Sequence, residues 1–350
     1  MDNLFCRICS ELSLGSMTEP PVRLHGGYTH RMFRLTTHTG DYAVKLLNAE
    51  VMQRPDALDH FRTAEAFESL LEERGLPILP ALTIGGRKLQ QVDGQYLYVF
   101  NYFDGHALKD NEITPAHCRR MGAALAGIHR AELVPPATPD AVGAPIGRPP
   151  PPPSANRPNA DSSPAKGSLW GELAQALLSS GDARAEGDML LAAAPMLARV
   201  TAAMEDAVRH LPPRETLCHN DMDAKNVLWQ GDDFRIIDLE CLGYADPRQE
   251  LLDLAISWAG WPAEEVRFKA FVQGYRDAGG VCDADAALLY DSRRNHIDWL
   301  EYNARRALFD DPEERRIGRE QIVETIGKIG SDQQARKTIL QWLEEININP

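Results

Sequence analysis

The sequence predicts an α+β fold, with five strands in the first 102 residues and a mainly helical remainder. Two observations predict it. Short apolar runs separated by turn residues fill 20–47 and 81–102, whereas apolar residues recur at helical spacing after 113. A length of 350 residues is also too great for one small core. We therefore expect two domains, 1–102 and 103–350.

The composition argues against several classes of protein. The formal net charge of −14 argues against a nucleic-acid partner and suits a cationic substrate, although solubility alone explains it equally well. No apolar run is long enough to span a bilayer, and the N-terminus lacks the basic start of a signal peptide. We expect a cytoplasmic protein without a membrane partner. The lone Cys6 and Cys9 pair lacks the second ligand pair of a zinc site.

The first three predicted strands carry a candidate phosphate-binding site. They span 21–24, 32–37 and 42–47. The first runs into Gly26-Gly27, and a Gly-Gly turn lets backbone N–H groups approach a phosphate, although most such pairs only form turns. In the third strand, Ala43 and Lys45 share a face. Because an unpaired lysine is costly to bury, Lys45 is either a phosphate ligand or an edge-strand lysine that hinders aggregation.

A long helix is predicted over 56–74, closed by Gly75 and Pro77. Glu65 and Glu68 both project near its buried side, where a carboxylate needs a cation, and Lys45 is the natural candidate. Periodicity does not decide between the two glutamates.

Two further strands are expected at 81–84 and 96–102. The second is apolar and leads directly into a loop, as a hinge between two lobes does. Phe100 and Tyr102 are therefore candidates for a hinge whose exposed backbone binds an adenine edge, and an ordinary buried strand is the alternative.

Helices are predicted beyond the hinge, interrupted by one segment of different composition. They span 114–130, 168–180 and 187–210. Between the first two, 134–168 is rich in Pro, Gly, Ala and Ser, with an unbroken proline run at 149–153. Such a segment buries too little apolar surface to fold alone, so we expect an exposed linker or insert with polyproline II character.

The stretch 216–240 holds the motif with the most specific spacing. Two apolar runs, 226–229 and 234–237, are joined by Gln-Gly-Asp-Asp and predict a tight β-hairpin. Asp221 precedes the first run by five residues, and Asp238 follows the second. Asp221 can accept the proton of an attacking hydroxyl, and the oxygens of Asn226 and Asp238 suit Mg²⁺. The alternative is a surface hairpin with polar ends.

The remaining sequence predicts helices and a candidate acceptor site. A helix that begins after Asp246 carries Glu250, and further helices are expected at 263–278, 284–308, 313–330 and 332–345. Asp298, Glu301 and Tyr302 share a helix face by their spacing. Acids beside an aromatic ring suit a cationic or sugar-like ligand. A solvated face, with Arg305 as the partner of Glu301, is the alternative.

Taken in order, these motifs resemble those of the aminoglycoside phosphotransferase and choline kinase superfamily. The shared features are the Gly-Gly turn, YAVK, the glutamate helix, the apolar hinge, HNDxxxxN, IIDLE and DPxxEL, and they cover about residues 20–310. The resemblance implies a bilobal protein-kinase-like fold, with a five-stranded antiparallel sheet and a helix in the first lobe and a mainly helical second lobe.

The resemblance also implies roles for individual residues. Lys45 and Glu65 would form the ion pair that holds the phosphates of ATP or GTP. The Gly26-Gly27 turn and the hinge at Phe100 and Tyr102 would also bind the nucleotide. Asp221 would be the catalytic base, braced by His219, and Asn226 and Asp238 would bind Mg²⁺. The residues that would line the acceptor pocket are Glu250, Asp298, Glu301 and Tyr302.

The departures from the protein-kinase pattern narrow the expected function. DLE replaces DFG, and no APE motif is visible, which speaks against a protein kinase. We expect a kinase that phosphorylates a hydroxyl group of a small polar or cationic acceptor. The acceptor class that we favour is an aminoglycoside-type or other antibiotic. The alternatives are a metabolic kinase for choline, an amino alcohol or a modified sugar, and a binding module without activity. The sequence leaves the oligomeric state open.

Overall fold

The computed structural model describes residues 2–24, 30–131, 166–210, 215–260, 262–282 and 294–348. By their contacts these residues form two compact units. The first holds the described parts of Met1–Ile113, Ala124–Gly147 and Thr216–Ala245, and the second those of Thr114–Ala123, Arg148–Glu215 and Asp246–Pro350. Most of the proline-rich segment lies outside the described residues. The domain boundary expected at residue 102 stays a prediction.

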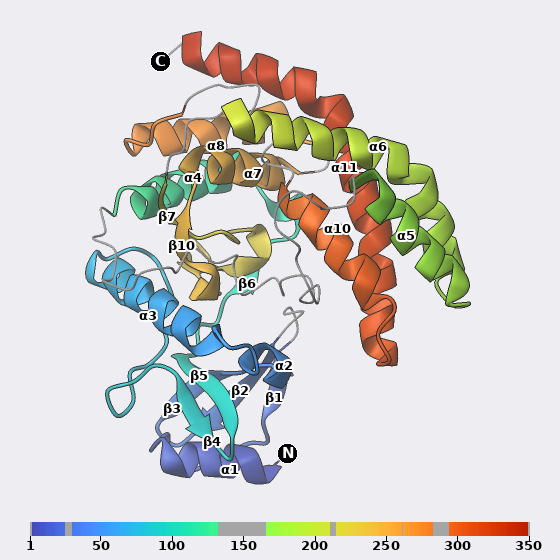
Figure 1. The fold of residues 1–350 in the computed structure, drawn as a ribbon. Coiled ribbons are helices and arrows are strands. Elements are labelled where there is room, and N and C mark those ends of the chain that lie inside the picture. The colour runs from blue at the N-terminus through green and yellow to red at the C-terminus, as the bar shows by residue number, and fades with distance from the viewer. Residues whose placement is uncertain are drawn as a thin grey trace. The chain divides into compact units, whose positions relative to one another are not determined.

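The first unit is built on a five-stranded antiparallel sheet in the order β1-β2-β3-β5-β4 (Figure 1). Its strands are β1 (Val22–Leu24), β2 (Arg31–Thr37), β3 (Gly40–Leu46), β4 (Gln90–Val92) and β5 (Gln95–Asn101). Central strand β3 pairs with both β2 and β5, and this register sets Lys45 opposite Met32 on one side and Tyr98 on the other. The α+β class and the antiparallel sheet expected from the sequence are confirmed.

One strand lies elsewhere than the sequence suggests. The run at 81–84 forms only isolated bridges, such as that between Ala81 and Phe100, and the remaining strand is β4. Asp93 and Gly94 join β4 to β5 with φ of 52° and 77°, the left-handed conformation that two-residue hairpin turns use. The Asp-Gly pair therefore marks the hairpin better than the apolar run does.

The two faces of the sheet pack against different helices. Val44, Leu46 and alternate residues of β5 form one buried cluster with Phe5 and Ile8 of α1 (Asp2–Glu11). On the other face, Tyr98 clusters with Val51 of α2 (Ala49–Met52) and Phe61 of α3 (Ala57–Glu73). Because side chains alternate along a strand, Lys45 projects from the face opposite α1.

Two small sheets complete the first unit. β7 (Thr216–Cys218) pairs with β10 (Gly243–Ala245), and β8 (Val227–Gln230) forms a hairpin with β9 (Asp233–Ile236) and also pairs with β6 (His106–Ala107). This hairpin confirms the one predicted at 226–237. Short 3-10 helices lie at η1 (Asp110–Glu112), η2 (Ala224–Asn226) and η3 (Leu239–Cys241). Helix α4 (Pro115–His129) contributes residues to both units.

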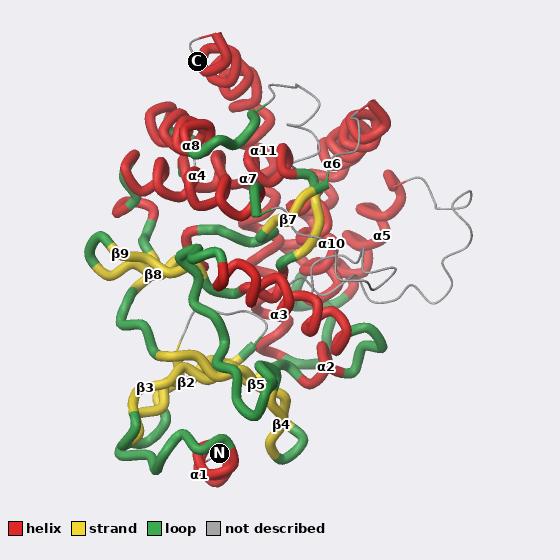
Figure 2. The backbone as a smooth tube through the Cα atoms, turned by 90° about the vertical axis from the view of Figure 1, so that its left-hand side faces the viewer, coloured by secondary structure: helices red, strands yellow, loops and turns green. Residues whose placement is uncertain are grey.

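The second unit is helical, as the red segments of Figure 2 show. Its described helices, besides the first part of α4, are α5 (Lys166–Ser179), α6 (Arg184–His210), α7 (Pro247–Ala259), α8 (Glu265–Asp277), α10 (Arg294–Arg306) and α11 (Pro312–Ile348). Residues of α5, α6, α10 and α11 share one apolar core that includes Trp170 and Leu300. None of the helices in the described ranges has the length and apolar content that a membrane span needs.

The C-terminal sequence forms one helix where two are expected. The break predicted near Gly330 is wrong, because α11 continues through Ser331. Gly-Ser-Asp resembles a helix end followed by a new N-cap. In the structure, however, Ser331 Oγ donates back to Lys328 O at 2.9 Å, and Ile329 and Ile339 are both buried. Burial on both sides of the glycine thus maintains the helix.

Close packing of α8 on α4 generates a stability prediction. A Cβ at Gly274 would lie 2.0 Å from the carbonyl oxygen of Arg119. We expect Gly274→Ala to lower the melting temperature by several degrees, because the two helices must separate and overpacking costs about 1–3 kcal/mol. Gly327→Ala in α11 is the matched control, since a Cβ there meets nothing within 4 Å. Thermal unfolding followed by circular dichroism compares them, and equal melting temperatures would contradict the packing.

Candidate active site

The Lys45 side chain binds two carboxylates from the segment after the β8–β9 hairpin. Its Nζ donates to Asp238 Oδ1 at 2.5 Å and also to Glu240 Oε2. Lys45 and Glu240 are each only 8% exposed, so water screens this contact poorly. Burial lowers the pKa of Lys45, but the Asp238 and Glu240 carboxylates outweigh burial and raise the pKa above its ordinary value. The lysine is therefore a fixed positive charge.

Glu240 is held from its other side by a histidine. Its Oε1 lies 3.1 Å from His30 Nε2, and His30 Nδ1 accepts from the Asn48 backbone N–H at 3.0 Å. Because Nδ1 accepts, the ring proton is on Nε2 and donates to Glu240. Burial raises the pKa of Glu240, but Lys45 and His30 outweigh it and lower the pKa below its ordinary value. Glu240 is thus a buried carboxylate with both oxygens engaged.

The expected ion pair between Lys45 and Glu65 is absent among the described residues. Glu65 Oε1 instead accepts from the Tyr98 hydroxyl and from the Leu89 backbone N–H, each at 2.9 Å. Tyr98 is the cross-strand neighbour of Lys45, so its ring lies on the same face and takes the glutamate. Burial first, and Glu65 next, raises the pKa of Tyr98, which therefore keeps the proton it donates.

Glu68, the other candidate on α3, is also engaged elsewhere. Its Oε1 accepts from Lys88 Nζ at 2.7 Å and from the Ala81 backbone N–H at 2.8 Å. Burial raises the pKa of Glu68 despite the Lys88 ammonium. The helix glutamates thus organise the β4–β5 side of the unit, and the residue that sequence reasoning missed is Glu240. Its signal was the glutamate that ends the IIDLE motif.

Asp221 is fixed by hydrogen bonds at both carboxylate oxygens. Lys225 Nζ donates to Oδ1 at 2.8 Å, and Asn226 Nδ2 donates to Oδ2 at 2.9 Å. The same Asn226 amide donates to the Asp221 backbone carbonyl at 2.7 Å. His219, which is fully buried, accepts from the Asp221 backbone N–H at 3.3 Å through Nδ1. The sequence motif therefore forms one local network around Asp221.

The hairpin brings Asn226 and Asp238 to the same end of a ribbon. The Ile237 backbone N–H donates to Asn226 O at 2.9 Å, so Asp238 directly follows the residue that faces Asn226. Asn226 uses its side-chain N–H groups on Asp221, and Asp238 uses Oδ1 on Lys45. Within the described residues, Asn226 Oδ1 and Asp238 Oδ2 accept no hydrogen bond. One amide oxygen and one carboxylate oxygen therefore remain, a donor set that fits Mg²⁺.

Two residues of this network have left-handed backbones. Asn220 and Asp238 both have φ of 64°, and only Ser13 and Asp93 share positive φ among the described non-glycine residues. Such conformations cost of order 1–3 kcal/mol and persist where surrounding contacts enforce them. Here Asn220 Nδ2 donates to Cys241 O at 2.9 Å, which ties the segment before Asp221 to the 3-10 helix after Asp238.

Of the other residues expected to bind the nucleotide, the described part of the chain includes Phe100 and Tyr102. The Tyr102 backbone N–H donates to Asp41 O at 3.0 Å, and the Arg34 guanidinium carbon lies 4.2 Å from the centre of the Tyr102 ring. Phe100 pairs with Ala43 of β3. Their hinge role stays a prediction. Gly26 and Gly27 lie outside the described residues.

The expected acceptor residues lie in the second unit. Glu250 is buried in α7, and Asp298 is exposed on α10. Glu301 Oε1 accepts from Arg305 at 2.8 Å and 3.2 Å, which is the i, i+4 pair that the alternative interpretation expected. The Tyr302 ring lies 5.7 Å from the ring of Trp299. A role in acceptor binding stays a prediction for all four.

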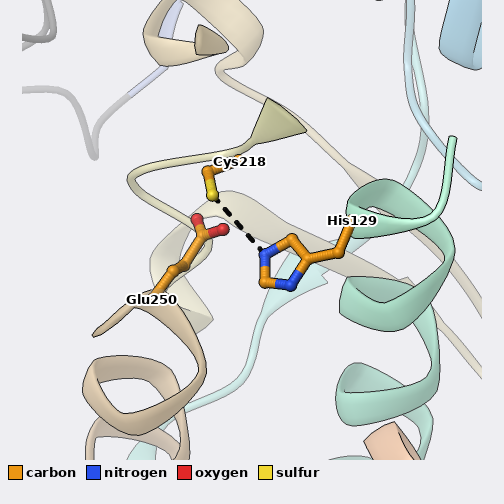
Figure 3. Close-up of side chains that lie close together, drawn as sticks. All are labelled: His129, Cys218 and Glu250. Atoms are coloured by element: carbon orange, nitrogen blue, oxygen red, sulfur yellow. Dashed lines mark hydrogen bonds between the residues drawn. The ribbon is translucent and has the colours of Figure 1, made fainter. Parts of the chain in front are cut away.

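The strand that leads into the motif is tied to the end of α4. Cys218 Sγ lies 3.7 Å from His129 Nε2, as Figure 3 shows, and Thr216 Oγ1 donates to His129 O at 2.8 Å. Thr216 and Cys218 both belong to β7, and Cys218 directly precedes His219 of the motif. His129 therefore positions the start of the motif and has a structural role here.

Comparison with known proteins places this geometry in a family. The family model described as the phosphotransferase enzyme family matches residues 22–289, which include every motif around Lys45, Asp221 and Asp238. The chain belongs to the phosphotransferase enzyme family. It is thus a phosphotransferase enzyme with an alcohol group as acceptor. The sequence comparison finds no match among curated proteins.

Solved structures share the fold of this phosphotransferase. The complex of spectinomycin phosphotransferase APH(9)-Ia with ADP and spectinomycin aligns with a TM-score of 0.70 at 14% identity, covering 95% of this chain and 99% of that one. A choline/ethanolamine kinase family protein from Mesorhizobium loti aligns with a TM-score of 0.58 at 16% identity, covering 97% and 100%. The amicoumacin kinase hAmiN, with AMP-PNP, Ca²⁺ and Ami, gives 0.56 at 12% identity, covering 92% of each chain. The expected protein-kinase-like fold is confirmed.

The buried Glu240 predicts how stability depends on pH. Its pKa in the folded phosphotransferase lies below the ordinary value of 4.5, so its ionised form stabilises the fold above that pH and the contribution is lost as pH falls. Glu240→Gln should therefore unfold at lower urea concentration than wild type at pH 7, with a cost of about 3 kcal/mol for one partner of a buried ion pair. The gap between the two midpoints should begin to narrow below pH 4.5 and close as pH falls through the lower pKa of the folded state.

Glu73→Gln, which removes an exposed carboxylate from α3, is the control. Its urea midpoint should equal that of wild type both at pH 7 and below pH 4.5. A Glu240→Gln midpoint that equals wild type at pH 7 would contradict the buried pair.

Proposed function

We propose that this phosphotransferase is a small-molecule kinase that transfers the γ-phosphoryl group of ATP or GTP to a hydroxyl of a small polar or cationic acceptor. The observation that carries the proposal is the contact of Lys45 with Asp238 beside a hairpin that also holds Asp221 and Asn226. A fixed ammonium, a carboxylate base and hard oxygen donors are the groups that phosphoryl transfer needs. All of them belong to one compact unit.

Each residue has a distinct task in this proposal. Lys45, aligned by Glu240, binds phosphate oxygens of the nucleotide and offsets their charge. Asn226 and Asp238 hold Mg²⁺, which neutralises phosphate charge and orients the triphosphate when bound. Asp221 accepts the proton of the acceptor hydroxyl as that oxygen bonds to phosphorus, while the bond from phosphorus to the bridging oxygen breaks and the nucleoside diphosphate leaves.

An aminoglycoside-type or other antibiotic is the acceptor class we favour, because spectinomycin phosphotransferase aligns with a TM-score of 0.70, against 0.58 for the choline/ethanolamine kinase family protein. A metabolic acceptor such as choline or an amino alcohol is the second candidate. It is supported by the likeness to a choline/ethanolamine kinase family protein and by His219-Asn220-Asp221, which resembles the HND form of choline-kinase-like members. The acidic residues Asp298 and Glu301 suit a cationic acceptor of either class.

An acceptor screen discriminates between the two classes. ADP release is measured with MgATP and, in turn, spectinomycin, other aminoglycosides, a macrolide, choline, ethanolamine and methylthioribose. Phosphorylation of an antibiotic with no turnover of choline or ethanolamine is the expected result. The reverse pattern would establish the metabolic assignment, and no turnover of any acceptor would contradict the kinase proposal.

The base and the metal ligand should respond differently to substitution. Asp221→Asn should lower kcat by about 10³-fold, since general-base catalysis contributes on this scale, while MgATP binding stays near the wild-type value. Asp238→Asn should instead weaken MgATP binding, because a neutral amide replaces the anionic ligand. Calorimetry and ADP release measure the two effects, with Asp59→Asn on the exposed side of α3 as control. Unchanged MgATP affinity in Asp238→Asn would refute the metal assignment.

The two candidate partners of Lys45 are separable by the same titration. Glu240→Gln should weaken MgATP binding about tenfold, because a loss near 1.4 kcal/mol is expected when Lys45 loses a charged neighbour that aligns it. Glu65→Gln should leave MgATP affinity close to wild type, because Glu65 contacts Tyr98 and not Lys45. The opposite ranking would restore Glu65 as the functional partner.

A further inference from the structure

Lys225 is a charged residue of the candidate active site to which the motif assigns no task. Its Nζ lies 2.8 Å from Asp221 Oδ1 and 3.2 Å from Asp223 Oδ2, so one ammonium bridges two carboxylates. Thr216–Ala245 contains only one other lysine or arginine, Arg235, which pairs with Asp233 at the far end of the hairpin. Lys225 is therefore the cation that this segment places against the catalytic carboxylate.

The two oxygens of Asp221 are held from the same short turn. Lys225 and Asn226 are consecutive in η2, and each donates to a different oxygen of the carboxylate. A carboxylate bound at one oxygen can rotate about its bond to Cβ, whereas one bound at both oxygens has its plane fixed. Asp223 holds the ammonium from the other side, which keeps a long side chain in a single place.

Charge gives the second reason for a lysine at this position. Asp221 and Asp223 are both partly exposed, and a nucleotide triphosphate is strongly anionic. Unscreened carboxylates would repel the phosphoryl group at the point of transfer. An ammonium 2.8 Å from the base offsets that repulsion without occupying the oxygen that Asn226 orients. The Lys225 side chain is 41% exposed, so it remains accessible from solvent.

We propose that Lys225 is a positioning residue for phosphoryl transfer, which orients Asp221 toward the acceptor hydroxyl and screens its charge from the incoming phosphates. Asp223 is the anchor that holds Lys225 in place. This inference rests on the proposed kinase function and adds to it a second cation, separate from Lys45. Its effect is on the chemical step, because Lys225 contacts the base and not the residues proposed to hold the nucleotide's phosphates.

Three variants test this assignment. Lys225→Met keeps the apolar stem and removes the charge, and should lower kcat about 10²-fold, the scale of one preorganised donor. KM for MgATP and its calorimetric Kd should stay within about threefold of wild type, because Lys225 contacts none of the residues proposed to hold the nucleotide's phosphates. Lys225→Arg, which keeps the charge, should recover kcat to within about tenfold of wild type. Asp223→Asn should lower kcat by a smaller factor than Lys225→Met.

Arg235→Met is the matched control, since it removes the other cation of the segment at a similar exposure of 33%. It should leave kcat within about twofold of wild type, as expected for a surface ion pair. The acceptor is whichever compound of the screen wild type turns over fastest, and the melting temperature of each variant is measured.

The outcomes separate this proposal from the proposed function. Wild type that turns over no acceptor overturns both. An active wild type with Lys225→Met at a similar kcat overturns the role of Lys225 and leaves the kinase function standing. A Lys225→Met protein that loses MgATP affinity and melting temperature, with no recovery in Lys225→Arg, assigns Lys225 a structural role and also overturns the proposal.

Discussion

The contact of Lys45 with Asp238 and Glu240 is the interaction on which the rest of the candidate site depends. It joins the central strand of the sheet to a segment 195 residues later in the chain. Breaking a buried pair by removing one partner costs about 3–5 kcal/mol, because the other charge is left without compensation. The sheet and the hairpin segment are thus held in one unit by this contact. In the proposed function the same three side chains also serve nucleotide binding.

The backbone conformation of two residues near this contact fixes the position of the groups that form it. Asp238 adopts a left-handed backbone at the end of β9, so its carboxylate turns toward Lys45 while the chain continues into η3 and presents Glu240. Asn220 has the same backbone conformation on the other side of the motif and bonds to the carbonyl of Cys241. Two strained residues, joined through η3, therefore hold the Asp221 segment and the Asp238 segment in a fixed relation.

Local patterns predicted much of this arrangement. The β8–β9 hairpin followed from two apolar runs and a Gly-Asp turn, and the spacing of Asp221, Asn226 and Asp238 around it indicated a kinase. The partner of Lys45 did not follow, because helical periodicity places Glu65 near the buried side without showing that Tyr98 takes its carboxylate. His30 and Glu240 meet across 210 residues, a separation that no local pattern encodes. The continuity of α11 depends likewise on tertiary burial around Gly330, which overrides the local helix-breaking signal.

A crystal structure of the protein with Mg²⁺ and AMP-PNP tests the central claim most directly. We expect phosphate oxygens within hydrogen-bond distance of Lys45 Nζ, with Lys45 still bound to Glu240 and the metal coordinated by Asn226 Oδ1 and Asp238. A triphosphate bound away from Lys45, or a Lys45 ammonium that has moved from Glu240 to Glu65, would contradict it.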